Sequence, residues 1–212
     1  MGETAKAASQ GDRTAETAMT TFDRIKHRAD NGDPVASYQL AHYLATLPSA
    51  AKHRQECVTL LKFAAAKGES RALYALGSWY LHGIGVKKSF KSGNALLLLA
   101  AKQGHPLAQF DLAVSLEKGK GVKKNSAQAF KWYLKAAEQG DLDAQVEVAR
   151  CYFHGIGTRA NVPSGVFWAR KAARRGNREA QLTLANCYKG GIGVKRNERL
   201  AEFWRTRARQ QD

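Results

Sequence analysis

Apolar and small residues return along this chain with a period of 36 residues. An alanine marks each return, an apolar residue follows it by four positions, and a glycine precedes it by four. A fixed period in this range is typical of a repeat array, in which each unit buries its apolar face against its neighbours. The alanines are Ala36, Ala72, Ala108, Ala144 and Ala180, the apolar residues are Leu40, Leu76, Leu112, Val148 and Leu184, and the glycines are Gly32, Gly68, Gly104, Gly140 and Gly176.

The first half of each repeat is predicted to be an amphipathic helix that ends in a glycine loop. Ala72, Leu76 and Gly77 fall on one helical face, and the small residues there allow a partner helix to approach. The loop pattern Gly-x-Gly-Val follows, because glycine tolerates the left-handed conformation common at helix ends. The loops are residues 83–86, 119–122, 155–158 (with Thr158 in place of Val) and 191–194, and the N-caps expected for the following helices are Ser89, Asn125, Asn161 and Asn197.

The second half of each repeat is predicted to be another helix, which runs over residues 129–140 in the third unit. Its expected inner stripe is Ala129, Trp132, Ala136 and Ala137, and Trp132 recurs as Trp168 and Trp204. Two antiparallel helices in each period predict an all-α fold, a right-handed α-solenoid.

The repeats divide the chain into a tail and a single array. Residues 1–13 are small and polar and are expected to form a flexible N-terminal tail. Residues 14–35 carry only second-helix features and are expected to cap the array as a half-repeat. The first full repeat has Leu47-Pro48-Ser49 where the glycine loop belongs, so its loop geometry should differ. The full repeats are residues 36–71, 72–107, 108–143, 144–179 and 180–212.

The repeat pattern resembles the Sel1-like repeat family, relatives of the tetratricopeptide repeats with a longer, glycine-bearing loop. The resemblance rests on Ala-x-Phe-x-Leu-Ala, Gly-x-Gly-Val and Trp-Tyr-x-Lys-Ala-Ala-Glu-Gln-Gly, and it covers about residues 22–212. Members of this family generally serve as adaptors, and some bacterial members are immunity proteins against a cognate secreted toxin. The resemblance therefore implies a non-enzymatic interaction protein.

The charge of the chain is strongly basic and concentrated toward its end. The formal net charge is +16, and the excess of basic residues is +1 in residues 1–70, +5 in 71–149 and +10 in 150–212. Such a field attracts acidic proteins, nucleic acid or anionic lipid. The aromatic residues of this region (Phe167, Trp168, Phe203 and Trp204) are expected in the core, which weakens the nucleic-acid alternative. The alternative to binding is that the C-terminal basic cluster forms the polar cap that an open solenoid end needs. This cluster is Arg170, Lys171, Arg174, Arg175, Arg178, Arg199, Arg205, Arg207 and Arg209.

Basic side chains also recur within the glycine loops. Stacked repeats would place them along one basic edge, which could dock phosphates or an acidic protein surface. The alternative is a solvated edge without a partner. The residues are Lys87, Lys88, Lys123, Lys124, Arg159, Lys195 and Arg196.

The first helices are expected to line an inner, concave face, as they do in tetratricopeptide arrays. Aromatic residues beside polar groups suit a protein-binding hot spot. The alternative for Tyr38, Tyr74 and Phe110 is core packing. The candidate partner-binding residues transferred by position are Tyr38, His42, Tyr74, Ser78, His82, Phe110, Val114, Lys118, Val146, Arg150, Phe153 and His154.

Residue patterns for catalysis, cofactors or metals are lacking in the sequence. It has no His-x-x-x-His, no Cys-x-x-Cys and no phosphate-binding loop after a strand. We therefore expect no catalytic, cofactor or metal residues. Cys57, Cys151 and Cys187 are unclustered, and we interpret them as free packing residues. The start of the chain lacks a signal-peptide pattern, so we expect a cytoplasmic location, or a periplasmic one if Met1 replaces a removed signal.

Three functional hypotheses remain from the sequence. The first is a scaffold that binds a protein partner, acidic in character, through the concave face or the basic edge, with an immunity protein as its specific form. The second is a nucleic-acid-associated protein that uses the basic C-terminal surface. The third is an enzyme, which the absence of a catalytic pattern disfavours.

Overall fold

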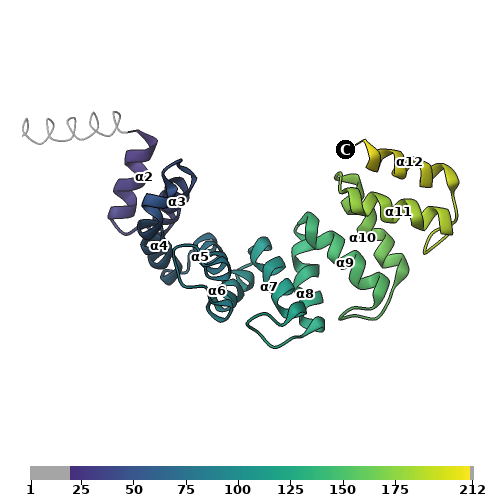
Figure 1. The fold of residues 1–212 in the computed structure, drawn as a ribbon, viewed down its shortest axis with the longest axis horizontal. Coiled ribbons are helices and arrows are strands. Elements are labelled where there is room, and N and C mark those ends of the chain that lie inside the picture. Colours follow the sequence, from purple (N-terminus) through teal and green to yellow (C-terminus); the bar gives the residue numbers. More distant parts are fainter. Residues whose placement is uncertain (1–19, 211–212) are drawn as a thin grey trace, which may run out of the picture. The chain divides into compact units, whose positions relative to one another are not determined.

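The computed structural model describes residues 20–210, and this part of the chain contains eleven helices and no strand (Figure 1). The chain divides into two compact units, residues 1–87 and 88–212, and each is described by itself. Within each unit, every helix packs against the next one in the chain. The first unit holds α2 (Thr21–Asp30), α3 (Pro34–Thr46), α4 (Ala50–Ala66) and α5 (Ser70–His82); the second holds α6 (Phe90–Lys102), α7 (Pro106–Lys118), α8 (Ser126–Glu138), α9 (Leu142–His154), α10 (Val162–Arg174), α11 (Arg178–Gly190) and α12 (Glu198–Arg209).

The helix starts repeat with the predicted period, and the predicted all-α solenoid class is confirmed. First helices begin at residues 34, 70, 106, 142 and 178, which are 36 residues apart. The second helices α6, α8, α10 and α12 begin at residues 90, 126, 162 and 198, with the same spacing. The division into a tail, a half-repeat and one continuous array stays a prediction, and the predicted tail lies outside the described residues.

Side-chain caps and glycines set the helix ends. The side chains of Ser89, Asn125, Asn161 and Asn197 accept hydrogen bonds from the first turn of their helices, as predicted. The first helices carry equivalent caps at Asp33, Glu69, His105, Asp141 and Asn177, which the sequence analysis missed. The short connection Leu47–Ser49 replaces the glycine loop between α3 and α4, and Ser49 makes no side-chain cap there.

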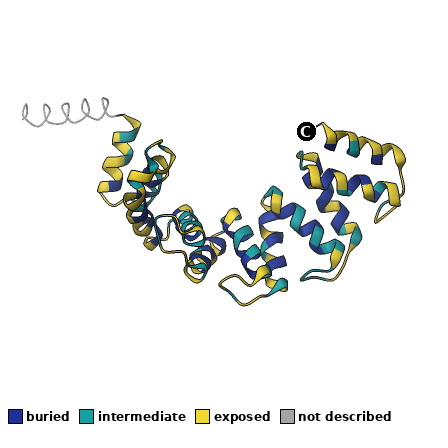
Figure 2. Cartoon of the chain, viewed as in Figure 1, coloured by how far each residue is buried: buried dark blue, intermediate teal, exposed yellow. Residues whose placement is uncertain are grey.

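The core lies where the helices of each unit meet (Figure 2). The predicted stripe of α8 needs one correction, because Trp132 is only half-buried while its neighbour Tyr133 is 2% exposed. Consecutive residues on a helix point about 100° apart, so one of this aromatic pair faces the core and the other faces outward. Trp168 and Trp204 are buried as predicted.

Three buried glutamines join first helices to the preceding second helices. The Nε2 atoms of Gln109, Gln145 and Gln181 donate to the carbonyls of Ala101, Ala137 and Ala173, at 3.1, 3.3 and 3.1 Å. Each glutamine lies one position after the alanine that marks its repeat. The same polar link therefore holds three successive repeat junctions of the second unit.

Candidate functional site

Four of the predicted partner-binding residues line one groove in the first unit. Tyr38 and His42 project from α3, and Tyr74 and Ser78 project from α5, around a groove of about 250 Å³. The rings of Tyr38 and His42 stack with their centroids 6.0 Å apart. The helical register explains this grouping, because α3 and α5 start one repeat apart and present equivalent positions to the same side. His82 is not among the lining residues.

The edge of this groove is organised by Arg71. Its guanidinium lies 4.8 Å from the centroid of the Tyr38 ring, and its Nε is 2.7 Å from Oε1 of Glu69. The other carboxylate oxygen of Glu69 accepts from the backbone N–H of Ala72 at 2.7 Å and caps α5. The aromatic wall is therefore tied to the start of α5, and Tyr38 packs within its unit while it lines the groove.

A second groove, of about 220 Å³, lies in the second unit. Val146, Arg150, Phe153 and His154 of α9 line it, together with Glu179 and Thr183 of α11. The structure thus brings the α9 candidates together as predicted by position. Gly165 of α10 makes room for this arrangement, because a Cβ at that position would lie 3.0 Å from the Phe153 ring.

Arg150 is held by two carboxylates beside this groove. Its Nη2 lies 2.6 and 2.9 Å from the two oxygens of Glu117 on α7, and its Nε lies 2.7 Å from Glu147. The hydroxyl of Tyr133 donates to Glu117 at 3.0 Å. Arg150 is therefore not a free cation, because two carboxylates face one guanidinium and leave a formal excess of one negative charge. Glu117 and Tyr133 were not among the residues predicted from the sequence. Glu117 and Arg150 are 33 residues apart, three fewer than one repeat, and this spacing could have indicated a contact between neighbouring first helices.

The protonation states of this cluster are strongly held. Burial raises the pKa of Tyr133, and the charge of Glu117 raises it further. Burial alone would lower the pKa of Arg150, but the hydrogen bonds to Glu117 and Glu147 raise it on balance. The phenol therefore stays a neutral donor and the guanidinium stays charged, so the cluster positions α7, α8 and α9 and does not act as a proton carrier.

The α7 candidates contribute differently from the α9 candidates. Phe110 is half-buried against Tyr133, with ring centroids 5.6 Å apart. It therefore packs against the core, which was the alternative to partner binding for this residue. Val114 is half-buried and Lys118 is exposed. None of the three lines the groove of the second unit.

The basic-edge residues are all exposed, and they lie in equivalent loops as predicted. Lys123 and Lys124 line a pocket, and Lys88 lies over the ring of Phe90 with Nζ 5.1 Å from its centroid. Arg196 pairs with Glu198, with Nη2 2.6 Å from Oε1. Most of this charge is available to a partner.

Several C-terminal arginines bind within the protein itself. Arg170 donates to the hydroxyl of Tyr188 at 3.1 Å, Arg178 donates to the carbonyl of Ala208 at 3.2 Å, and Arg175 donates to the carbonyl of Gly140. Arg205 pairs with Glu202 at 2.8 Å. The contacts of Arg170 and Arg175 join successive repeats, that of Arg178 joins the two helices of the last repeat, and that of Arg205 lies within α12, so part of the basic cluster has a structural role.

The expectation that Phe167 and Phe203 lie in the core is wrong. They are 51% and 49% exposed, because each precedes a buried tryptophan on its helix and cannot face inward with it. Lys171 lies beside this surface, with Nζ 5.0 Å from the Phe167 centroid. The second unit thus presents exposed aromatic rings next to cations.

Three further features concern metal binding, membrane spanning and the cysteines. Residues 20–210 hold no group of three or more His, Cys, Asp or Glu side chains that could bind a metal ion. None of the helices described is both long enough and apolar enough to span a bilayer. Cys57, Cys151 and Cys187 are free and buried, in agreement with their interpretation as packing residues.

Comparison with known families identifies the repeat. The Sel1 repeat model matches residues 70–105, 106–141, 142–177 and 178–212, which together cover all of the second unit and the end of the first. No curated protein matches the chain.

Solved structures share this fold. A protective antigen of uropathogenic Escherichia coli with an SLR fold aligns at a TM-score of 0.86 and 29% identity, over 91% of this chain and 41% of that one. A Sel1 repeat protein from Oxalobacter formigenes aligns at 0.78 and 30% identity, over 88% of this chain and 54% of that one. A sel1 repeat protein from Klebsiella pneumoniae aligns at 0.55 and 18% identity, over 90% and 92%. The chain thus spans about half the length, or less, of the first two.

Proposed function

Since the chain belongs to the Sel1 repeat family, we propose that it is a non-enzymatic scaffold that binds an acidic protein through its first-helix grooves. Sel1 repeats suggest a protein-interaction role. To this role the proposal adds an acidic partner and a binding face on the first helices. One observation carries the choice of face: each unit has a groove where an aromatic ring lies beside a polar side chain, Tyr38 with His42 in one and Phe153 with His154 in the other. Such pairs dominate binding energy in protein interfaces.

The acidity of the partner is supported by charge. The net charge of +16 and the exposed loop lysines would raise the encounter rate with a negative surface. The grooves are lined by helical residues that are already packed, so little conformational entropy is lost on binding. Docking would then be close to rigid.

Affinity capture with variants of the full chain tests the binding face. The immobilised wild type, His42→Ala and Phe153→Ala would each be exposed to a nuclease-treated extract of the native cell, with Phe203→Ala as the control. Phe203 is an exposed aromatic outside both grooves. We expect a protein with an acidic isoelectric point to bind the wild type and the control and to be lost with a groove variant. Equal capture by all four chains would contradict the proposed face.

An immunity protein is the specific form of this scaffold role. A toxin-like open reading frame beside the gene would identify the partner to test, and co-expression would then have to restore growth. Groove variants that still protect the cell as well as the wild type would exclude the grooves from this role.

A second candidate is nucleic-acid association, which is favoured by the exposed Phe167 beside Lys171 and by the exposed ring of Phe203. Aromatic rings interleaved with cations stack bases while the cations bind phosphates. A salt titration of fluorescent single-stranded RNA tests it. Lys171→Glu should make the plot of log affinity against log salt concentration less steep, by the amount expected for about one lost phosphate contact. Phe167→Ala should weaken binding. Lys67→Glu, another lysine placed over an exposed phenylalanine, is the control.

A further inference from the structure

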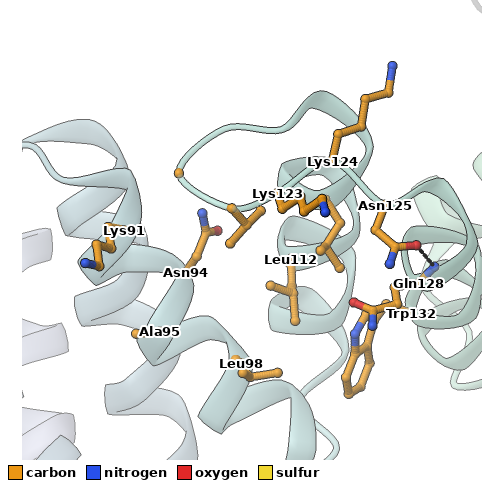
Figure 3. A pocket seen from close by; sticks show the side chains of 13 residues that line it. Lys91, Asn94, Ala95, Leu98, Leu112, Lys123, Lys124, Asn125, Gln128 and Trp132 are labelled. Atoms are coloured by element: carbon orange, nitrogen blue, oxygen red, sulfur yellow. Dashed lines mark hydrogen bonds between the residues drawn. The ribbon is translucent and has the colours of Figure 1, made fainter.

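A pocket of about 580 Å³ lies in the second unit, apart from the first-helix grooves (Figure 3). It is bounded by α6, by the loop that follows α7, and by α8. Asn94 and Leu98 come from α6, Lys123 from the loop and Trp132 from α8. No residue of this Asn94 pocket also lines the groove of the second unit.

Two residues that line the Asn94 pocket differ from most of their counterparts in the repeat pattern. The position of Asn94 is occupied by Phe22, Val58, Phe130 and Val166 in the other second helices that face a following first helix. The position of Leu116 is occupied by Tyr80, Tyr152 and Tyr188 in three repeats and by Leu44 in the first. Asn94 with Leu116 is the pair that lacks an aromatic ring.

The next junction carries two aromatic rings at the equivalent positions. There the rings of Phe130 and Tyr152 meet edge to face, with their centroids 5.2 Å apart. Asn94 and Leu116 are both smaller than the residues of that pair. Asn94 and Leu116 belong to successive repeats, so the smaller pair changes the wall of the pocket at this junction. At the next junction an equivalent loop pocket of about 590 Å³ is lined by Tyr152 instead.

The walls of the Asn94 pocket combine apolar surface with positive charge. Leu98, Leu112 and Trp132 form the apolar wall, and the exposed Lys91, Lys123 and Lys124 stand around it. No acidic residue is among those that line it. A ligand that matches these walls has one apolar group flanked by negative charges.

Asn94 adds a polar group at the inner end of the pocket. Its side chain is buried, at 2% exposure, and its Nδ2 donates to the carbonyl of Lys120 at 2.6 Å. Its Oδ1 is buried and has no hydrogen-bond partner among the described residues. Buried acceptors normally have a donor, so this atom marks a place for a ligand N–H.

We propose that the Asn94 pocket binds an extended acidic peptide segment, with one apolar side chain against Leu98, Leu112 and Trp132. Carboxylates on either side of that residue pair with the lysines, and a peptide N–H approaches Oδ1 of Asn94. The proposal rests on the scaffold function and deepens it, because this segment would belong to the acidic partner and would bind outside the first-helix grooves.

A synthetic peptide tests the pocket directly. The probe is a fluorescein-labelled Glu-Asp-Glu-Phe-Glu-Asp-Glu peptide, and its fluorescence anisotropy is measured with the full chain at physiological salt. A second probe with alanine in place of phenylalanine reports the apolar contact. We expect the alanine probe to bind about tenfold more weakly, since a phenyl group leaves water only in the first case.

Two variants of the chain separate pocket binding from general attraction to a basic protein. Leu116→Tyr installs the residue found at three of the four aligned positions and places a ring against the apolar wall, with a loss of affinity of about tenfold or more and no fall in melting temperature. Lys123→Glu with Lys124→Glu should cause a similar loss. Lys195→Glu with Arg196→Glu, the same change in an equivalent loop outside the pocket, is the control and should change affinity less than about threefold.

The outcomes distinguish this proposal from the scaffold function. Equal loss in the test and control charge variants, or full binding by the Leu116→Tyr variant, would overturn the pocket, and so would no binding of the phenylalanine probe. Partner capture that depends on Phe153 would still support the grooves in each of those cases. Chemical-shift changes at the Asn94 side-chain amide and the Trp132 indole N–H on peptide addition would support the pocket, and changes confined to α9 and α11 would overturn it.

Discussion

Arg150 of α9 reaches across to Glu117 of α7, with its Nη2 2.6 and 2.9 Å from the two carboxylate oxygens. The pair joins first helices of successive repeats, and Tyr133 of the intervening second helix donates to the same carboxylate. The carboxylate of Glu117 therefore connects three consecutive helices beside a candidate binding groove, through one ion pair and one hydrogen bond.

This pair should contribute measurably to stability. Glu117→Ala, Arg150→Ala and the double variant form a thermodynamic cycle measured by urea unfolding. We expect a coupling of about 1 kcal/mol, because both side chains are largely screened from water and Arg150→Ala leaves two carboxylates without their cation. Arg196 and Glu198, with side chains 71% and 59% exposed, are the control pair and should couple by less than about 0.5 kcal/mol. Equal coupling in the two pairs would show that burial does not matter here.

The cysteines should be unreactive until the chain unfolds. Burial raises the pKa of all three thiols, and that of Cys151 rises from 9.0 to about 11. The thiolate is the reactive form, so iodoacetamide at about pH 8 should modify none of them in the native chain and all three in urea. Mass spectrometry of the labelled chain is the measurement. Labelling of native Cys151 at the rate found in urea would contradict its burial.

Cys151 should also make stability fall at alkaline pH. Its thiol keeps a proton in the folded chain that the unfolded chain loses above pH 9, so the free energy of unfolding decreases as pH rises from 9 to about 11. Cys151→Ala should show a shallower decrease over this window in urea titrations. Parallel curves for the two proteins would mean that other groups cause the loss.

Two loop glycines should differ in their tolerance of alanine. Both have a positive φ, +69° at Gly157 and +94° at Gly176, so alanine is strained at each by about 1 kcal/mol. A Cβ at Gly157 would also collide with the Ser126 carbonyl of α8. A Cβ at Gly176 would have no neighbouring heavy atom of the described residues within 4 Å. We expect Gly157→Ala to cost about 3 kcal/mol or more in urea unfolding and Gly176→Ala about 1. Similar costs would mean that the loop simply moves aside.

Gln145 should tolerate replacement by leucine. Its Oε1 is buried and has no hydrogen-bond partner within residues 20–210. The Ala137 carbonyl that accepts from its Nε2 also accepts from the backbone N–H of Gly140. Gln145→Leu therefore leaves no new unpaired group and should change stability by less than about 1 kcal/mol, while Gln145→Ala should cost about 2 through the cavity. Gln109→Leu is the comparison, because it also removes the 2.8 Å bond from Gln139 and should cost more than Gln145→Leu.

The repeat period was the part of the fold that local chemistry could predict. Asn125 and Asn161 cap their helices as expected because a cap depends on the backbone of its own first turn. Phe167 and Trp132 were placed wrongly because each has an aromatic neighbour, and helical periodicity does not decide which of two adjacent rings faces the core. The α9 groove was predicted in outline, since its residues share one helix face, but its link to Glu117 was not.

The sequence by itself determined the helices, their caps and their 36-residue repetition, because these follow from interactions between residues close along the chain. Tertiary structure decided which side chains are already paired and where space remains. Arg150 is paired with a carboxylate of another helix, and Asn94 and Leu116 line a pocket at a junction where the next repeat carries two rings. Both outcomes depend on distances between helices, which a one-dimensional pattern does not contain.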